Sequence, residues 1–338
     1  MGNKGGSVGT GRGGDCARGI VCMSTQTSAM RQLALIQMLA GAVILGTNGL
    51  MVRFAGVGAT VSAFWRMFLA ALLLAALVQW RHGWQRLPRA AWGWIAAAAL
   101  AFAMDLWMWH RSILLVGPGL STLLGNAQVF FMVLAGALFF GERISPRFLA
   151  GVLLAMLGLW LLLAGDWQQQ GSDYRWGVIF GLGTGLAYAL YNISIKRVQS
   201  ESAKTLTRMP VEQILCLAAF GSAAALALMA QAEGTSLALP DWQSFAILLA
   251  LAAFGHCLSW GLISRAIAVL PVALVGLLLL VQPTVAYVLD VLLGLANPGS
   301  RQWAGLALTL LGIFIAGLKP RLRSMSKTKV ERSRLQSG

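Results

Sequence analysis

The sequence predicts an all-α integral membrane protein with ten transmembrane helices, arranged as two inverted repeats of five helices each. Composition, ten long apolar runs and an internal repeat support this prediction. Apolar residue types make up 58% of the 338 residues and charged types only 11%, whereas a soluble domain carries about a quarter charged residues. Such a chain could not cover a water-facing surface with polar groups, so we expect lipid to be its solvent.

The ten apolar runs are each long enough to cross a bilayer. A hydrocarbon core about 30 Å thick requires roughly 20 apolar residues in helical conformation. Because backbone groups in lipid must bond to one another, each run is expected to be a helix. The runs are 33–54, 60–80, 92–113, 118–140, 147–165, 176–196, 211–232, 243–267, 271–295 and 302–318.

The basic residues predict the orientation. Lys and Arg gather in alternate connecting segments and in both tails, as expected of cytoplasmic segments. With a cytoplasmic N-terminus, the outside segments hold only Arg53, Arg175 and Arg301, and Arg66 and Arg111 lie within helices; this leaves 26 − 5 = 21 basic residues inside. We therefore expect a multi-pass inner (cell) membrane protein with both termini cytoplasmic. The net charge of +15 forms no single basic face, so nucleic acid is not an expected partner.

The chain also repeats itself at an offset of 154 residues. Residues 111–158 align with 265–312 without a gap and share thirteen identities, among them Arg111/Arg265 and Gln128/Gln282. Since each unit has five spans, an odd number, the two halves enter the membrane in opposite directions. Inverted repeats are typical of secondary transporters, which expose a midplane site to each side in turn.

Two other classes of protein compete with a carrier: a polytopic membrane enzyme, and a channel or scaffold. The sequence has no nucleotide-binding loop, zinc motif or nucleophile motif. It also lacks a segment that resembles a selectivity filter. We expect a carrier without enzymatic activity, cofactor or metal, whose partners are a small-molecule substrate and membrane lipid.

Several segments resemble the drug/metabolite transporter superfamily, specifically its EamA-type members. The best is STLLGNAQVFFMVLAGALFFGERISPRFLAGVLLAMLGLWLLL (121–163), which is similar to the family's fourth and fifth helices with their Gly-Glu junction. LGTNGLMVR (45–53), FWRMFLAALLLAAL (64–77) and LVQPTVAYVLDVLLG (280–294) resemble the first, second and ninth helices. The resemblance covers about 33–318.

This resemblance implies a ten-helix carrier, commonly an exporter of amino acids or related metabolites that is driven by exchange or an ion gradient. A coupled proton or a counter-substrate is thus a further expected partner. Three positions depart from the family pattern. Val129 replaces a Pro, Ala296 replaces the acid of the second Gly-Glu junction, and Leu45 replaces a Trp.

The domain organisation follows from the repeat. We expect a disordered cytoplasmic tail at 1–32, a first five-helix EamA-like repeat at 33–165, a second at 176–318 and a basic cytoplasmic tail at 319–338. The glycine- and serine-rich composition of the first segment predicts its disorder.

Charged groups within the spans are candidates for the substrate pathway. An ionisable group at bilayer depth costs about 2.5 kcal/mol or more, so it needs a partner or water. Arg66 and Asp105 lie at similar depth in neighbouring spans. They could form a structural ion pair, or Arg66 could hold a substrate carboxylate while Asp105 binds an amine or a proton.

The remaining candidates are histidines, amides and aromatic residues at membrane depth. His256 could relay protons or bond to a carbonyl, and His110 could extend toward the headgroups. The amides could join helices or line a cavity. Together the expected substrate pathway comprises Asn48, Arg66, Asp105, Trp109, His110, Asn126, Gln128, Tyr188, Tyr191, His256, Trp260, Gln282 and Tyr287.

Overall fold

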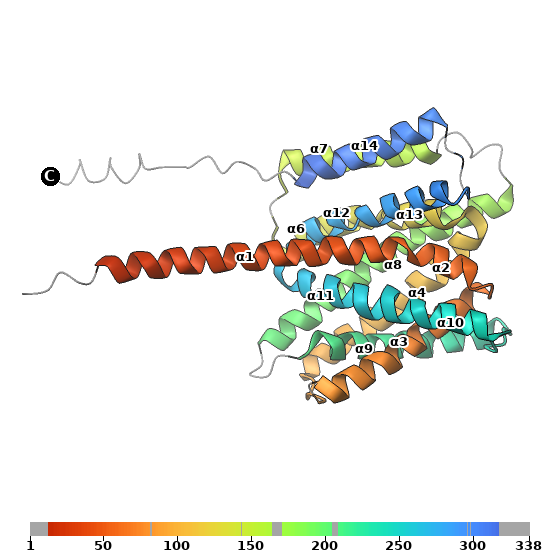
Figure 1. Ribbon diagram of the computed structural model, residues 1–338, viewed down its shortest axis with the longest axis horizontal. Helices are drawn as coiled ribbons and strands as arrows, with labels where there is room; N and C mark the ends of the chain where they lie inside the picture. Colours follow the sequence, from red (N-terminus) through yellow and green to blue (C-terminus); the bar gives the residue numbers. More distant parts are fainter. Residues whose placement is uncertain are drawn as a thin grey trace, which may run out of the picture.

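The computed structural model describes residues 13–81, 83–142, 144–163, 171–204, 209–295, 297 and 299–317, and these residues form helices without any strand (Figure 1). The helices are α1 (Gly13–Gly46), α2 (Asn48–Phe54), α3 (Ala59–Arg81), α4 (Arg89–Val116), α5 (Pro118–Gly125), α6 (Gln128–Phe140), α7 (Pro146–Leu163), α8 (Ser172–Ala203), α9 (Val211–Ala232), α10 (Trp242–Ala252), the π-helix η1 (Ala253–Leu258), α11 (Ser259–Val269), α12 (Val272–Leu278), α13 (Val281–Leu292) and α14 (Ser300–Gly317).

The helices agree with the ten predicted runs. Within the described part of the chain, eight helical stretches are long and apolar enough to cross a membrane, some of them made of two or three helices in line. α7 supplies a shorter apolar helix over Pro146–Gly158, and α14 covers the tenth run. The chain is therefore an all-α, multi-pass membrane protein.

The N-terminal boundary differs from the expectation. α1 begins at Gly13 rather than at residue 33, so the helix extends into the segment that we expected to be disordered, and this part projects beyond the other helices (Figure 1). The apolar stretch that can span a membrane begins at Ala29. The first twelve residues and the tail 319–338 lie outside the described residues.

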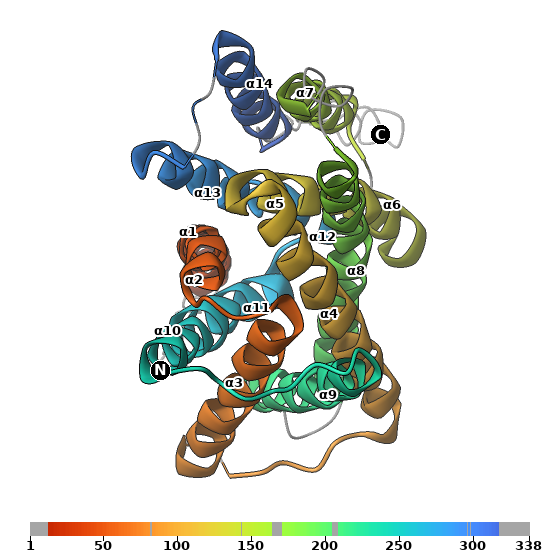
Figure 2. The same cartoon turned by 90° about the vertical axis from the view of Figure 1, so that its right-hand side faces the viewer.

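The packing of the helices repeats the symmetry of the sequence. α4 packs along α8, and α1 packs along α11, which is the equivalent pair of the repeat. α3 packs on α9, α5 on α13, α6 on α12 and α7 on α14, so each of these contacts joins equivalent membrane spans of the two halves. Figure 2 shows α7 and α14 as a two-helix layer beside the main bundle.

Glycines allow α7 and α14 to approach closely. A Cβ atom added to Gly158 would lie 2.5 Å from the Gly305 carbonyl oxygen, and one added to Gly312 would lie 2.5 Å from that of Gly151. Apolar side chains gain little from leaving lipid for a helix interface, so close backbone packing contributes more of the association energy there. The layer depends on the absence of side chains at these positions.

We expect Gly158→Ala to lower the melting temperature of the purified protein, because the added methyl group must push the two helices apart at a cost of about 1–3 kcal/mol. Thermal unfolding in detergent measures this. Gly261→Ala is the matched control, since nothing lies within 4 Å of its added Cβ and Ala favours helix over Gly. Equal losses in both variants would contradict the packing role of Gly158.

A polar cluster joins α3, α4 and α9 where α9 ends. Glu233 accepts hydrogen bonds from Thr60 Oγ1 at 2.7 Å and Trp107 Nε1 at 2.6 Å, and it pairs with Arg111 Nη2 at 2.5 Å. The Arg111 guanidinium also lies 4.0 Å from the centroid of the Trp107 ring. Burial raises the pKa of Glu233, but these hydrogen bonds and the charge of Arg111 outweigh it, so that the pKa lies below its ordinary value.

This cluster should give a pH-dependent contribution to stability. Because the folded-state pKa of Glu233 is lower than the unfolded value of about 4.3, its contribution is present above about pH 4.3 and is lost as the pH falls through the folded value. Glu233→Gln should therefore lower the melting temperature near neutral pH and change it little in strong acid. Glu201→Gln, which removes an exposed i,i+3 pair with Lys204, should have a small effect throughout. A difference for Glu233→Gln that grows on acidification would refute this linkage.

Candidate functional site

Four of the predicted spans are interrupted inside the bundle. α1 and α2 are separated at Thr47, α5 and α6 at Asn126 and Ala127, and α12 and α13 at Leu279 and Leu280, while η1 widens the span between α10 and α11. Each interruption frees backbone N–H and C=O groups from the helix pattern. At membrane depth such groups are tolerated only where protein buries them or a cavity adjoins them.

Amide side chains supply partners at these interruptions. Asn126 follows the last residue of α5 and donates from Nδ2 to the Thr122 carbonyl at 2.7 Å. Gln128 begins α6 and donates from Nε2 to Asn126 Oδ1 at 3.4 Å. Asn192 of α8 in turn donates to Gln128 Oε1 at 3.3 Å. These contacts join the fourth and sixth predicted spans.

The π-helix presents one carbonyl to several donors. The Gly255 carbonyl accepts from Ser259 Oγ at 2.7 Å, from Asn48 Nδ2 at 3.0 Å and from Arg66 Nη2 at 3.3 Å. A Cβ at position 255 would collide with the Asn48 amide. Glycine is thus required for Asn48 and Arg66 to reach this carbonyl, and π-helical turns frequently occur at functional sites.

The interruptions converge on a cavity of about 30 Å³, which is large enough to hold water. Its lining combines two opposite charges, five residues with an amide or aliphatic hydroxyl group, and an aromatic wall. The lining residues are Leu45, Asn48, Arg66, Phe102, Asp105, Leu106, Trp109, Thr122, Gly125, Asn126, Thr184, Tyr188, Trp260 and Gln282.

Arg66 and Asp105 both face this cavity, yet they do not form an ion pair. They are 2% and 6% exposed, and the ion pairs among the described residues join other groups. The Arg66 Nε and Nη1 atoms are buried without a hydrogen-bond partner, and its guanidinium lies 5.7 Å from the centroid of the Trp109 ring. The interpretation of these two residues as a direct structural pair is therefore wrong.

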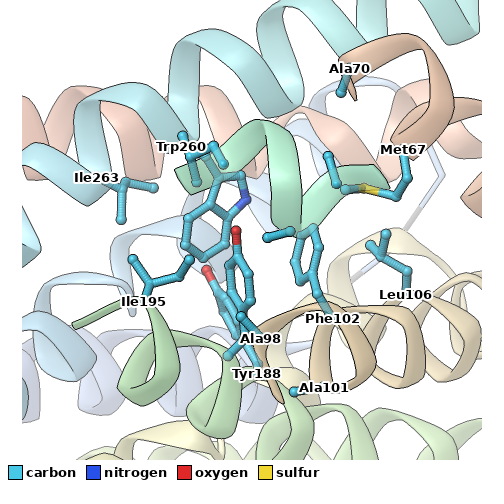
Figure 3. Close-up of a cluster of buried hydrophobic side chains, with 14 of the residues drawn as sticks. Met67, Ala70, Ala98, Ala101, Phe102, Leu106, Tyr188, Ile195, Trp260 and Ile263 are labelled. Atoms are coloured by element: carbon cyan, nitrogen blue, oxygen red, sulfur yellow. The ribbon is translucent and has the colours of Figure 1, made fainter. Parts of the chain in front are cut away.

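Aromatic rings form one wall of the cavity. Tyr191 stacks on Phe102 with ring centroids 4.2 Å apart and meets Trp260 edge-on at 4.6 Å. Tyr188 meets Trp260 edge-on at 5.7 Å. Figure 3 shows the rings of Phe102, Tyr188 and Trp260 pointing toward one another from α4, α8 and α11. These rings offer an apolar surface close to the charged groups.

Most of the predicted pathway residues are brought together by the fold. Those that line the cavity are Asn48, Arg66, Asp105, Trp109, Asn126, Tyr188, Trp260 and Gln282. Five do not line it. Tyr191 and His256 lie behind Phe102 and Trp260, and Gln128 bonds to Asn126 and Asn192.

The other two lie farther from the predicted arrangement. His110 is fully buried beside Trp109, so it does not extend to the headgroups. Tyr287 packs with Leu123 and Leu306 in a separate cluster. Both positions depend on which way each helix is turned, which the order of residues along a span does not reveal.

Sequence reasoning missed six lining residues, namely Leu45, Phe102, Leu106, Thr122, Gly125 and Thr184. The spacing of helix faces gave a usable signal for three of them. Phe102, Asp105, Leu106 and Trp109 follow the spacing of one helix face, so Asp105 and Trp109 together predict the other two. Thr184 likewise lies one turn before Tyr188 on α8.

Known proteins show similarity over most of the chain. The family described as EamA-like transporter matches residues 32–164 and 175–318. The chloramphenicol-sensitive protein RarD of Pseudomonas aeruginosa is 28% identical over 71% of this chain and 77% of its own length. A probable amino-acid metabolite efflux pump of Escherichia coli is 34% identical, but the match spans only 25% of this chain and 28% of that protein.

A solved crystal structure of a protein gives a TM-score of 0.67 at 20% sequence identity, over 84% of this chain and 98% of the other. At this identity the likeness concerns the fold alone. The two ranges matched by the family correspond to the two five-helix repeats and leave few residues of the membrane region outside. The chain therefore belongs to the EamA-like transporter family.

Proposed function

We propose that this protein is a secondary carrier that exports a small zwitterionic metabolite, such as an amino acid or a related compound, by alternating access between its two repeats. The carrying observation is that Arg66 and Asp105 are buried at one cavity without contacting each other. A buried charge is costly unless it is paired. A ligand with a carboxylate and an ammonium group would supply both partners.

The remaining groups fit such a ligand. The unpartnered guanidinium nitrogens of Arg66 match a carboxylate, which Arg can bind through two parallel hydrogen bonds. The Asp105 carboxylate would accept from an ammonium group. The wall of Phe102, Tyr188 and Trp260 would contact an apolar or aromatic part of the substrate.

Transport requires the site to expand. The cavity of about 30 Å³ is small, and we expect the helices around it to move when a substrate binds. The mirrored pairing of the two halves supports a rocking motion that opens each side in turn. The placement of Lys and Arg supports cytoplasmic termini in an inner membrane, and the name of the Escherichia coli relative favours export. A proton or a counter-substrate would drive the cycle.

Counterflow of labelled amino acids into liposomes tests this function. Saturable counterflow supports a carrier, whereas flux that does not saturate indicates a pore and turnover without flux indicates an enzyme. Arg66→Gln and Asp105→Asn should each lower counterflow about 30-fold or more, because losing a buried charged contact costs about 2–5 kcal/mol. Arg81→Ala, at the exposed end of the same helix α3, should retain native flux.

The charge-exchanged variant Arg66→Asp with Asp105→Arg sharpens this test. Because the two residues make no ion pair, the double variant should show no more counterflow than either single variant. Recovery of flux would show that the pair is structural and would overturn the assignment of both residues to the substrate.

A second prediction concerns Gln282, which also lines the cavity. Gln282 Oε1 accepts a hydrogen bond from Tyr188 OH at 3.4 Å, and the side chain is 7% exposed. Gln282→Trp should abolish counterflow while leaving expression intact, since an indole would fill the substrate space. Val288→Trp on the same helix, where the native side chain is 37% exposed, should leave flux unchanged. Normal flux in Gln282→Trp would remove this residue from the pathway.

A further inference from the structure

Two carboxylates accept hydrogen bonds from the first backbone N–H groups of equivalent helices, at opposite ends of the bundle. Glu142 follows α6 and accepts from the backbone N–H groups of Val272 at 2.7 Å and Ala273 at 3.0 Å, which begin α12. Asp290 on α13 accepts through Oδ2 from the Gly119 N–H at 2.6 Å, near the start of α5. Gly119 and Ala273 are equivalent in the repeat. Each half therefore carries a carboxylate that caps the fourth helix of the other half.

Sequence alignment conceals this symmetry. Ala296 occupies the repeat position of Glu142, so the second half lacks the expected acid. Asp290 lies 296 − 290 = 6 residues earlier and reaches the helix start from there. A helix N-terminus carries unpaired N–H groups and partial positive charge, so an ionised carboxylate stabilises it. Each of these carboxylate–backbone contacts joins one half of the protein to the other, and we call them the Glu142 latch and the Asp290 latch.

The two latches differ in one respect. Both Glu142 oxygens are bonded to N–H groups, whereas Asp290 uses only Oδ2. The Asp290 Oδ1 atom is buried without a hydrogen-bond partner, in a side chain that is 5% exposed. Leaving a buried polar atom unbonded is unfavourable. A proton on Oδ1 would remove the charge from this unbonded oxygen.

Few other charges face Asp290 among the described residues. Arg53 on α2 interacts with it through space, and Tyr287 lies one turn earlier on α13. The start of the packed helix α14 carries Arg301. α5 has no titratable side chain, and the described side chains of α1 include only Arg31, at the opposite end of that helix. Among the side chains of these helices that the structure describes, no second carboxylate competes for the proton.

We propose that Asp290 is the proton-binding residue of this carrier and that its protonation releases the latch between α13 and α5. A proton from water at that end adds to Oδ1, and the carboxylate becomes a neutral acid. The hydrogen bond from Gly119 then loses its charge assistance, and Arg53 loses its counter-charge. In the orientation proposed above this is the outer end, so a proton from outside favours opening there. The role of Asp290 in transport rests on the proposed carrier function.

Infrared difference spectroscopy of the full chain in liposomes tests proton binding without any substrate. Lowering the pH from about 8 to about 5 should produce a protonated-carboxyl band. Asp290→Asn, which keeps an oxygen for the Gly119 N–H, should lose a component of this band, whereas Glu142→Gln should keep it. Identical spectra for Asp290→Asn and the native protein would overturn the proposal.

Transport measurements then test coupling. A proton gradient should stimulate export about fivefold or more in the native protein, within the usual range for coupled sites, and less than about 1.5-fold in Asp290→Asn. Stimulation should persist in Glu142→Gln. Undiminished stimulation in Asp290→Asn would overturn the assignment. Absence of flux in the native protein would instead defeat the carrier function, and the infrared result would still decide whether Asp290 binds the proton.

A second variant covers the case in which Asp290→Asn does not fold. Asp290→Glu keeps a carboxyl group but moves it relative to Gly119 and Arg53. The midpoint of the infrared titration should shift in this variant. An unchanged midpoint would show that the titrating group is elsewhere and would overturn the proposal.

Discussion

The site depends on the requirement that every backbone polar group at membrane depth finds a partner. Four spans are interrupted, and each interruption leaves N–H or C=O groups outside the regular helix pattern. Asn48, Asn126 and the Gly255 carbonyl belong to these places, and each contributes to a network of buried hydrogen bonds. The polar lining of the cavity is thus also what makes the interruptions stable. The need for hydrogen-bond partners at membrane depth therefore explains both where the cavity lies and why its lining is polar.

The charges at the cavity have a different role from the amides. The amides largely bond to the protein itself, whereas Arg66 retains two nitrogens without partners and Asp105 faces the cavity without an ion pair. Groups that only stabilise the fold would be expected to meet, because separated charges in a region of low dielectric are unfavourable. Their separation is understandable if binding, rather than stability, determines where they lie.

Duplication explains the paired helices, but the two halves are not chemically equal. The repeat exchanges the contact of α5 with α13 for the contact of α12 with α6, and the contact of α7 with α14 joins the last helices of the two halves. The carboxylates that cap the fourth helices come from different sequence positions and use different numbers of oxygens. A symmetric scaffold supports alternating exposure, while unequal latches let one end respond to a proton and the other remain fixed.

The sequence by itself determined the lipid environment, the ten apolar runs and the two repeats, because run length, composition and repeat spacing are properties of the chain order. It also identified Arg66, Asp105 and Gln282, since polar residues are rare in apolar runs. Only the tertiary structure decided that Arg66 and Asp105 do not pair and that Tyr287 lies away from the cavity, as these outcomes depend on helix rotation and on where spans are interrupted. Contacts between distant segments, such as Asn48 with Gly255, depend on the tertiary structure, and the local sequence does not encode them.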